Sequence, residues 1–166
     1  MKFNYYTALL EEARRIDKDC NCISRDEILE RKLVHDKWRD GVMDRLYTDF
    51  LPPIERRDLL TLVQNIGYIA YEVREVVTLK SITSAEGVLL REKLQTAISF
   101  LAKETEALPK KRCNPKRLRE TVYSMLSLWR DCVKSGGEPS LCDGIEAVSE
   151  ALLKYADTLE TICVLM

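Results

Sequence analysis

Residues 46–80, LYTDFLPPIERRDLLTLVQNIGYIAYEVREVVTLK, decide the fold class of this chain. One helix ends at Pro52 and Pro53, because proline has no backbone N–H to donate, and Pro53 suits the first turn of the next helix. The apolar residues that follow recur with the period of an α-helix for about five turns. They are Leu59, Leu62, Val63, Ile66, Ile69, Ala70, Val73, Val76 and Val77. The stretch therefore predicts two helices joined by a short turn, the second with one face in a core.

The composition is typical of a globular helical protein. The chain has 166 residues, of which 46% are hydrophobic and 32% are charged. A single domain of this length buries about 70% of its unfolded surface, which is enough for a core without disulfide bonds. The formal net charge of -1 gives no field that would draw the whole molecule to nucleic acid, so we expect no nucleic-acid partner.

The cysteines and the first residues bear on the compartment. The six cysteines include no C-x-x-C pair, and the single histidine, His35, is remote from the closest pair, Cys20 and Cys22. This spacing does not support a zinc site. The first residues contain no apolar signal segment, and no apolar run is long enough to span a bilayer. We therefore expect a cytoplasmic protein with reduced thiols.

Turn signals and helical periodicity divide the chain into successive helical segments. We expect helices over about 2–18, 25–50, 54–80, 85–107, 115–134 and 140–164. Ser24 and Ser84 are candidate caps of the second and fourth helices, and Asn114 of the fifth. The candidate core of the second helix is Ile28, Leu29, Leu33, Trp38, Val42, Met43, Leu46 and Tyr47. No segment alternates like a strand, so we predict an all-α, antiparallel bundle of about six helices in one domain.

An internal similarity relates the third and sixth predicted helices. The apolar positions of residues 59–76 match those of residues 145–162 when the two segments are superposed. A duplication would divide the chain into about 1–80 and 84–166. Two unrelated amphipathic helices would also match in this way, so both interpretations stay open.

Two groups of carboxylates have a spacing that suits an oxygen-ligated metal ion. Glu146 and Glu150 lie about one turn apart on the last helix, and Asp157 lies about two turns further along. Asp36 and Asp40 have the same one-turn spacing on the second helix. A solvated helix face has this spacing as well, so both interpretations stay open for each group.

The largest local excess of positive charge is a basic cluster before and within the fifth helix. We define it as Lys110, Lys111, Arg112, Lys116, Arg117 and Arg119. Cations in the first turns of a helix oppose its macrodipole, so helix stability does not explain them. An acidic protein partner or an anionic membrane surface would explain them, and a solvated surface is the other interpretation.

The sequence shows no catalytic signature. It has no Gly-x-Ser-x-Gly, phosphate-binding loop or dinucleotide fingerprint, and one histidine cannot supply the two Glu-x-x-His motifs of di-iron bundles. We expect Tyr68 and Tyr71 to pack in the core, where Gly67 would let a neighbouring helix approach closely; a ligand role is the alternative. We therefore expect no enzyme and no catalytic residue.

A proline-centred junction joins the second and third helices. Asp36, Leu46 and Tyr47 precede the run FLPPIERRD at 50–58. These residues resemble the first half of the PhoU-like phosphate-transport accessory proteins, in particular the shorter branch found beside Pit-type phosphate permeases. The last helix resembles the closing helix of that family more weakly. The resemblance implies two three-helix units and a cytoplasmic regulator that acts at the inner face of the membrane.

The metal-binding acids that the resemblance implies are partly replaced. Acids expected on the third helix fall at Gly67, Tyr68 and Tyr71, and others fall at Lys32 and Lys154. The resemblance therefore implies degenerate metal sites, no resident cofactor and at most a weakly bound divalent metal. The remaining candidate ligands are Glu146, Glu150, Asp157, Asp36 and Asp40.

These observations lead to one functional expectation and one alternative. We expect a non-enzymatic regulatory or binding module of phosphate transport, which binds a phosphate permease or its regulator through the basic cluster. Self-association into a homo-oligomer stays open. The alternative is a metal-dependent hydrolase of the phosphatase type that uses the carboxylates of the last helix, Glu146, Glu150 and Asp157.

Overall fold

A computed structural model describes residues 3–20, 25–50, 52–77, 85–136 and 139–165 of the chain. Within these ranges the backbone forms six α-helices and no strand, which confirms the predicted all-α class. The helices are α1 (Tyr5–Asp19), α2 (Arg25–Thr48), α3 (Arg56–Val77), α4 (Ala85–Ala107), α5 (Lys116–Lys134) and α6 (Pro139–Leu165). A 3₁₀ helix, η1 (Leu108–Lys110), forms part of the loop expected between α4 and α5. The predicted caps Ser24 and Ser84 lie outside the described residues, as does the predicted end of the third helix at 78–80.

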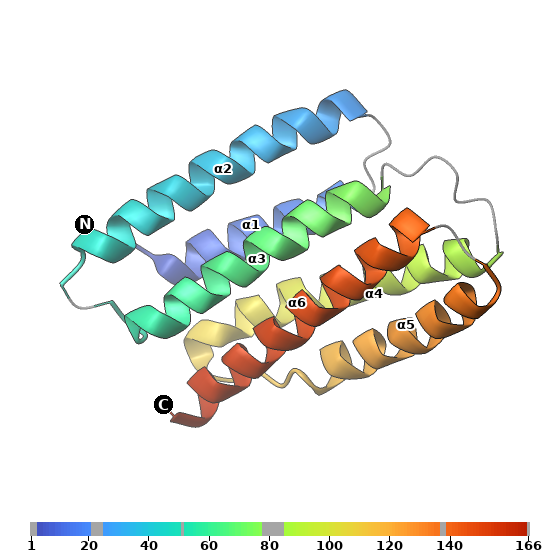
Figure 1. Cartoon of the computed structure of the whole chain (residues 1–166). Helices are drawn as coiled ribbons and strands as arrows, with labels where there is room; N and C mark the ends of the chain where they lie inside the picture. Colours follow the sequence, from blue (N-terminus) through green and yellow to red (C-terminus); the bar gives the residue numbers. More distant parts are fainter. Residues whose placement is uncertain (1–2, 21–24, 51, 78–84, 137–138, 166) are drawn as a thin grey trace.

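Each helix reverses the direction of the one before it, so that all six run along one common axis (Figure 1). The two ends of the chain lie at the same end of the bundle as the α2–α3 and α4–α5 connections (Figure 1). No helix in the described part of the chain is both long and apolar enough to cross a bilayer.

The helices α3 and α6 form the centre of the molecule, where they pack against each other. Beside them α1 packs against α4, while α2 covers α1 and α3, and α5 covers α4 and α6. The packing order of α1–α3 is thus repeated by α4–α6, although a duplication of the sequence stays a prediction. The core residues predicted for α3 and α6 are buried: Leu59, Leu62, Ile66, Ile69, Val73, Val148, Leu152 and Leu159.

Short polar contacts fix the starts of two helices. The side-chain Oδ1 of Asn4 accepts a hydrogen bond of 3.0 Å from the backbone N–H of Thr7, as N-cap residues do. The N-cap of α5 is Pro115 and not the predicted Asn114, although Oδ1 of Asn114 accepts from the backbone N–H of Lys116 at 3.3 Å. These contacts satisfy backbone donors that the first turn of a helix leaves without a partner.

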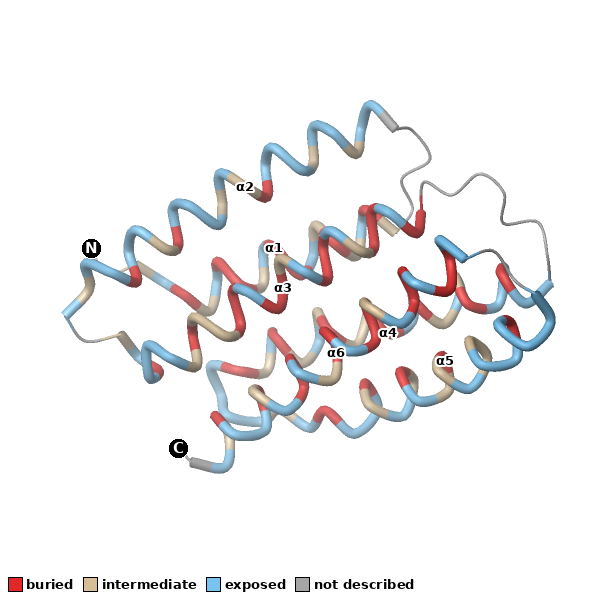
Figure 2. The backbone as a smooth tube through the Cα atoms, in the orientation of Figure 1, coloured by how far each residue is buried: buried red, intermediate tan, exposed pale blue. Residues whose placement is uncertain are grey.

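The helix α2 is the least buried of the six. Figure 2 shows it mostly exposed along the edge of the bundle. The prediction that Leu29, Leu33 and Tyr47 belong to the core is wrong, since they are 57%, 68% and 69% exposed. The physical reason is that the apolar residues of α2 lie on several sides of the helix, whereas it packs only against α1 and α3. Its buried side chains are His35, Val42 and Leu46.

Candidate functional site

Four charged or titratable side chains are buried where α1, α2 and α3 meet. We call Glu12, Asp19, His35 and Arg74 the buried ionic cluster, and none of them is more than 5% exposed. The His35 Nδ1 atom lies 2.6 Å from Oε1 of Glu12. Arg74 donates from Nε and Nη2 to Oδ2 of Asp19, over 3.0 and 2.8 Å. Buried charges cost free energy unless they are paired, so these contacts allow the cluster to lie inside the protein.

Further arginine contacts balance the two carboxylates of the cluster. Nε of Arg15 lies 2.9 Å from Oε2 of Glu12, and Nε of Arg31 lies 3.4 Å from Oδ1 of Asp19. Nη2 of Arg74 is also 4.0 Å from Oε1 of Glu12, so this guanidinium interacts with both carboxylates. Both acids come from one face of α1, because residues seven positions apart lie about two turns apart on the same side of a helix.

A pocket of about 470 Å³ lies between α2 and α3, and Arg74 and His35 of the buried ionic cluster form part of its wall. Its volume is within the range of small-molecule sites in proteins. We call it the α2–α3 pocket. It is lined by Ile28, Lys32, His35, Asp36, Arg39, Val63, Gln64, Gly67, Tyr68, Tyr71, Glu72, Arg74 and Glu75.

His35 presents its second ring nitrogen to this pocket. Glu12 holds Nδ1, whereas Nε2 has no hydrogen-bond partner in the described part of the chain. Gly67 of α3 faces this nitrogen, since a Cβ atom built on Gly67 would lie 3.4 Å from Nε2. A Cβ at this distance would be in ordinary van der Waals contact, so the approach of α2 does not require glycine at this position. The absent side chain leaves the Nε2 edge accessible.

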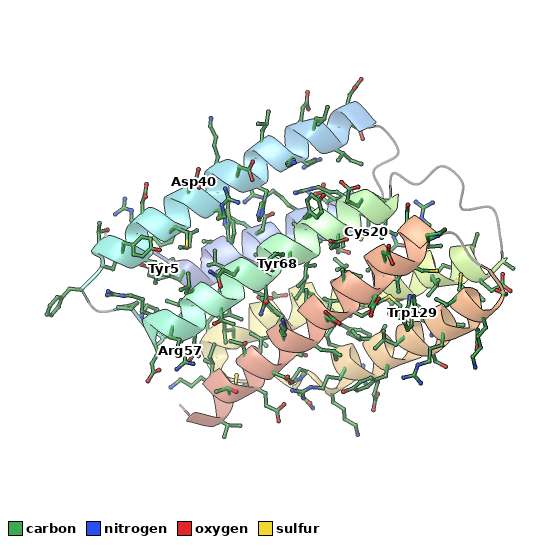
Figure 3. All side chains as sticks on the ribbon, viewed as in Figure 1. Tyr5, Cys20, Asp40, Arg57, Tyr68 and Trp129 are labelled. Atoms are coloured by element: carbon green, nitrogen blue, oxygen red, sulfur yellow. The ribbon has the colours of Figure 1, made fainter. Side chains whose placement is uncertain are left out.

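Two tyrosines of α3 form an aromatic wall of the pocket. Tyr68, labelled in Figure 3, is 65% exposed and Tyr71 is 49% exposed. The prediction that both pack in the core is wrong, because both side chains line the pocket between α2 and α3 and stay largely accessible there. The ammonium of Lys32 lies over the ring of Tyr71, 5.8 Å from its centroid.

The carboxylates of the pocket differ in their surroundings. Asp36 lies 3.7 Å from the guanidinium of Arg39, as an exposed ion pair. Glu72 has no ion-pair partner among the residues that the structure describes. Burial raises the pKa of Glu72, and the charge of Glu75 raises it further. Glu72 is therefore an acceptor whose negative charge no neighbouring cation offsets.

The carboxylates predicted as metal ligands on α6 lie at the surface. Glu146, Glu150 and Asp157 are exposed. Oδ1 of Asp157 is 2.8 Å from Nη2 of Arg119, so this carboxylate already has a cationic partner. Among the described residues, no three His, Cys, Asp or Glu side chains are grouped so that they could hold a metal ion.

The other two predicted ligands separate on α2. Asp36 lines the α2–α3 pocket, while Asp40, labelled in Figure 3, is exposed. Arg39 lies between them in sequence and pairs with both, at 3.7 and 3.5 Å. A weakly bound divalent metal at these acids stays a prediction.

The basic cluster divides into two parts. Arg119 forms ion pairs with Asp157 and Glu160 of α6 and is the only half-buried member. The others are exposed, and no described carboxylate lies within ion-pair distance of them. We call these others the free cations: Lys110, Lys111, Arg112, Lys116 and Arg117.

The buried ionic cluster and the pocket are the features that sequence reasoning missed. A signal was present on α1, because Glu12 and Asp19 fall on the same side as the apolar residues Leu9, Ala13 and Ile16. Acids on an apolar stripe are rarely buried unless they are paired. Their partners come from two other helices, and no spacing within one segment identifies such partners.

No protein-family description matches the sequence, and no curated protein matches it. The PhoU-like resemblance of residues 36–77 therefore stays a prediction.

Proposed function

We propose that this protein is a non-catalytic binding module that captures a small molecule in the α2–α3 pocket. The observation that carries the proposal is His35, which is 5% exposed, is held at Nδ1 by Glu12 and has its Nε2 edge unpartnered at the pocket. A ring nitrogen that is open to a pocket can be satisfied there by water or by a ligand. The buried ionic cluster holds this edge in place before any ligand arrives, which limits the entropy lost on binding.

The lining of the pocket supports binding rather than catalysis. A carboxylate–histidine pair can activate a hydroxyl or thiol nucleophile that lies within hydrogen-bond reach. The α2–α3 pocket has no Ser, Thr or Cys side chain in its described lining. Its apolar and aromatic members, Ile28, Val63, Tyr68 and Tyr71, instead supply the contact area that small-molecule sites use.

Access to Nε2 can be tested by replacing Gly67 with Ala. The added Cβ would lie 3.4 Å from Nε2, which is an ordinary contact, so the fold tolerates it while the nitrogen becomes covered. A mixture of small organic fragments is titrated into the full chain, and backbone amide signals of residues 28–39 and 63–75 are followed by NMR. We expect some fragments to shift these signals in the unmodified protein and to bind Gly67→Ala much more weakly.

The matched control is Gly41→Ala on α2, where a Cβ would meet no atom within 4 Å. Both substitutions should stabilise their helices by about 0.5–1 kcal/mol, because glycine is a poor helix former. Only Gly67→Ala should weaken binding. If no fragment shifts the pocket signals, or if the two variants bind alike, the proposal is wrong.

A second candidate function, docking on an acidic protein surface, is favoured by the free cations. Lys116 and Arg117 oppose the dipole of α5, and no described carboxylate offsets them. With the PhoU-like resemblance of residues 36–77, this charge supports an acidic cytoplasmic loop of a phosphate permease as the partner. Charge complementarity of this kind speeds association and is weakened by salt.

The docking function can be tested by replacing Lys111, Arg112, Lys116 and Arg117 together by Ser. We expect the melting temperature to hold or rise slightly, because unfavourable charges leave the start of α5. Binding to an immobilised Glu-rich peptide should fall and lose its salt dependence. A control with the same change of net charge replaces Lys37, Arg130, Lys134 and Lys154, which are exposed elsewhere. Equal loss in the control, or a preference for anionic vesicles over the peptide, would reject the acidic protein partner.

A further inference from the structure

We infer that the ligand of the α2–α3 pocket is a small organic cation, a primary amine attached to an aromatic or apolar body. This inference rests on the proposed binding function and adds the chemical class of the ligand. Three observations support it: the pairing of charges in the pocket wall, the hydrogen bond of His35, and the rings of Tyr68 and Tyr71.

The two arginines of the pocket wall are already paired with carboxylates. Arg74 is bound through two nitrogens to Asp19, deep in the buried ionic cluster. Arg39 pairs with Asp36 and with Asp40 outside the pocket. An anionic ligand would have to compete with these carboxylates, and displacing a buried one would leave a charge without a partner. The third cation of the wall, Lys32, has no carboxylate partner among the described residues, and its ammonium lies over the ring of Tyr71. The two guanidinium groups are therefore not available to an anionic ligand, and Lys32 is the one remaining positive charge in the described lining.

The remaining capacity of the pocket is for accepting hydrogen bonds. In the tautomer in which Nδ1–H of His35 donates to the carboxylate of Glu12, Nε2 is an acceptor. Glu72 adds a carboxylate without an ion-pair partner in the described ranges. The raised pKa of Glu72, caused by burial and by Glu75, is the response of a carboxylate that lacks a nearby cation. An ammonium group donates three hydrogen bonds, and its positive charge would pair with the carboxylate of Glu72.

The aromatic wall favours the same class of ligand. Tyr68 and Tyr71 are spaced so that their rings lie on one side of α3, and both are largely exposed. The Lys32 ammonium already lies 5.8 Å from the Tyr71 centroid, within the distance at which a cation is attracted to an aromatic face. A ligand ammonium would take the same kind of position at the exposed ring of Tyr68, while its apolar body contacts Ile28 and Val63.

The test compares three ligands that share a phenyl ring and differ in charge: 2-phenylethylamine, 2-phenylethanol and phenylacetate. Each is titrated into the full chain, and the amide signals of residues 28–39 and 63–75 are followed. We expect the amine to bind at least about tenfold more tightly than the alcohol or the carboxylate. Glu72→Gln should remove most of this preference, measured as the ratio of the affinities for the amine and the alcohol. The matched control is Glu150→Gln, an exposed glutamate of α6, which should change neither affinity.

The outcomes separate the inference from the proposed function. If phenylacetate or the alcohol binds the pocket as tightly as the amine, the ligand class is wrong and the binding function stands. If Glu150→Gln lowers the amine affinity as much as Glu72→Gln, the preference comes from net charge and the inference fails. If none of the three ligands shifts the pocket signals, the inference about the ligand class fails. The proposed binding function fails as well only if the fragment mixture also causes no shift of these signals.

Discussion

Glu12 joins three helices through a single carboxylate. It has no exposed surface, and its oxygens face His35 of α2, Arg15 of α1 and Arg74 of α3. A buried carboxylate in this position compensates cations that would otherwise be desolvated without a partner. The contribution of Glu12 therefore depends on its charge as much as on its volume.

Replacing Glu12 by Gln tests the charge at nearly constant volume. We expect the variant to lose about 3–5 kcal/mol of unfolding free energy, because Arg15 and Arg74 would be left undercompensated inside the protein. The neighbouring Glu11 is exposed, so Glu11→Gln should change stability by less than about 0.5 kcal/mol. Urea unfolding followed by circular dichroism measures both. A loss below about 1 kcal/mol for Glu12→Gln would mean that the ion pairs contribute little.

At the level of the element, α2 is held differently from the other helices. Trp38 donates its Nε1–H to the carbonyl of Ala8 over 2.8 Å, and Arg31 reaches Asp19 of α1. Its fully buried apolar side chains are Val42 and Leu46 in the half that leads to the proline junction. The other half contributes His35 and the wall of the α2–α3 pocket.

Two leucines of α2 should differ widely in their effect on stability. Leu46 is 1% exposed, so Leu46→Ala should cost about 2–5 kcal/mol through lost burial and the cavity left behind. Leu33 is 68% exposed, so Leu33→Ala should change stability by less than about 0.5 kcal/mol. Chemical denaturation of the two variants measures the difference. Similar losses would show that the outer side of α2 is covered in solution, for example by a second copy of the chain.

The sequence predicts α3 far better than it predicts the surroundings of α2. On α3 the apolar residues from Leu59 to Val77 follow one stripe, so the period alone identifies the buried face. On α2 the apolar residues point in several directions. Ile28 and Leu29 are neighbours of similar size and hydrophobicity, but only Ile28 packs against the core. The pocket lies between two helices, and part of its wall belongs to the buried ionic cluster, whose members come from three helices. No pattern within one helix contains that information.

At the scale of the whole molecule, the two halves meet where α3 packs against α6. Gly144 of α6 lies at a point of close approach, because a Cβ built there would come within 2.7 Å of Cγ2 of Val76. A methyl group of valine has little freedom to move away in a packed core. The spacing of the two halves is therefore set in part by the absence of a side chain at Gly144.

Gly144→Ala should destabilise the protein although alanine is the better helix former. We expect a loss of about 1–3 kcal/mol from overpacking against Val76. Gly41→Ala on α2, which has open space, should instead gain about 0.5–1 kcal/mol. Thermal and urea unfolding of both variants give the signs. A stabilised Gly144→Ala variant would mean that α3 and α6 separate easily, contrary to the close packing described here.

The mainly polar attachment of α2 has a consequence for how the whole molecule unfolds. Denaturant slopes and heat-capacity changes scale with the surface that unfolding exposes. Detachment of α2 would expose little apolar surface, since few of its apolar side chains are fully buried. Amide hydrogen exchange in α2 should therefore hardly depend on urea, whereas exchange in α3 and α6 should accelerate steeply. Ordinary melting curves would then report the unfolding of the five remaining helices only. They would not detect the state in which α2 is detached and the α2–α3 pocket is open.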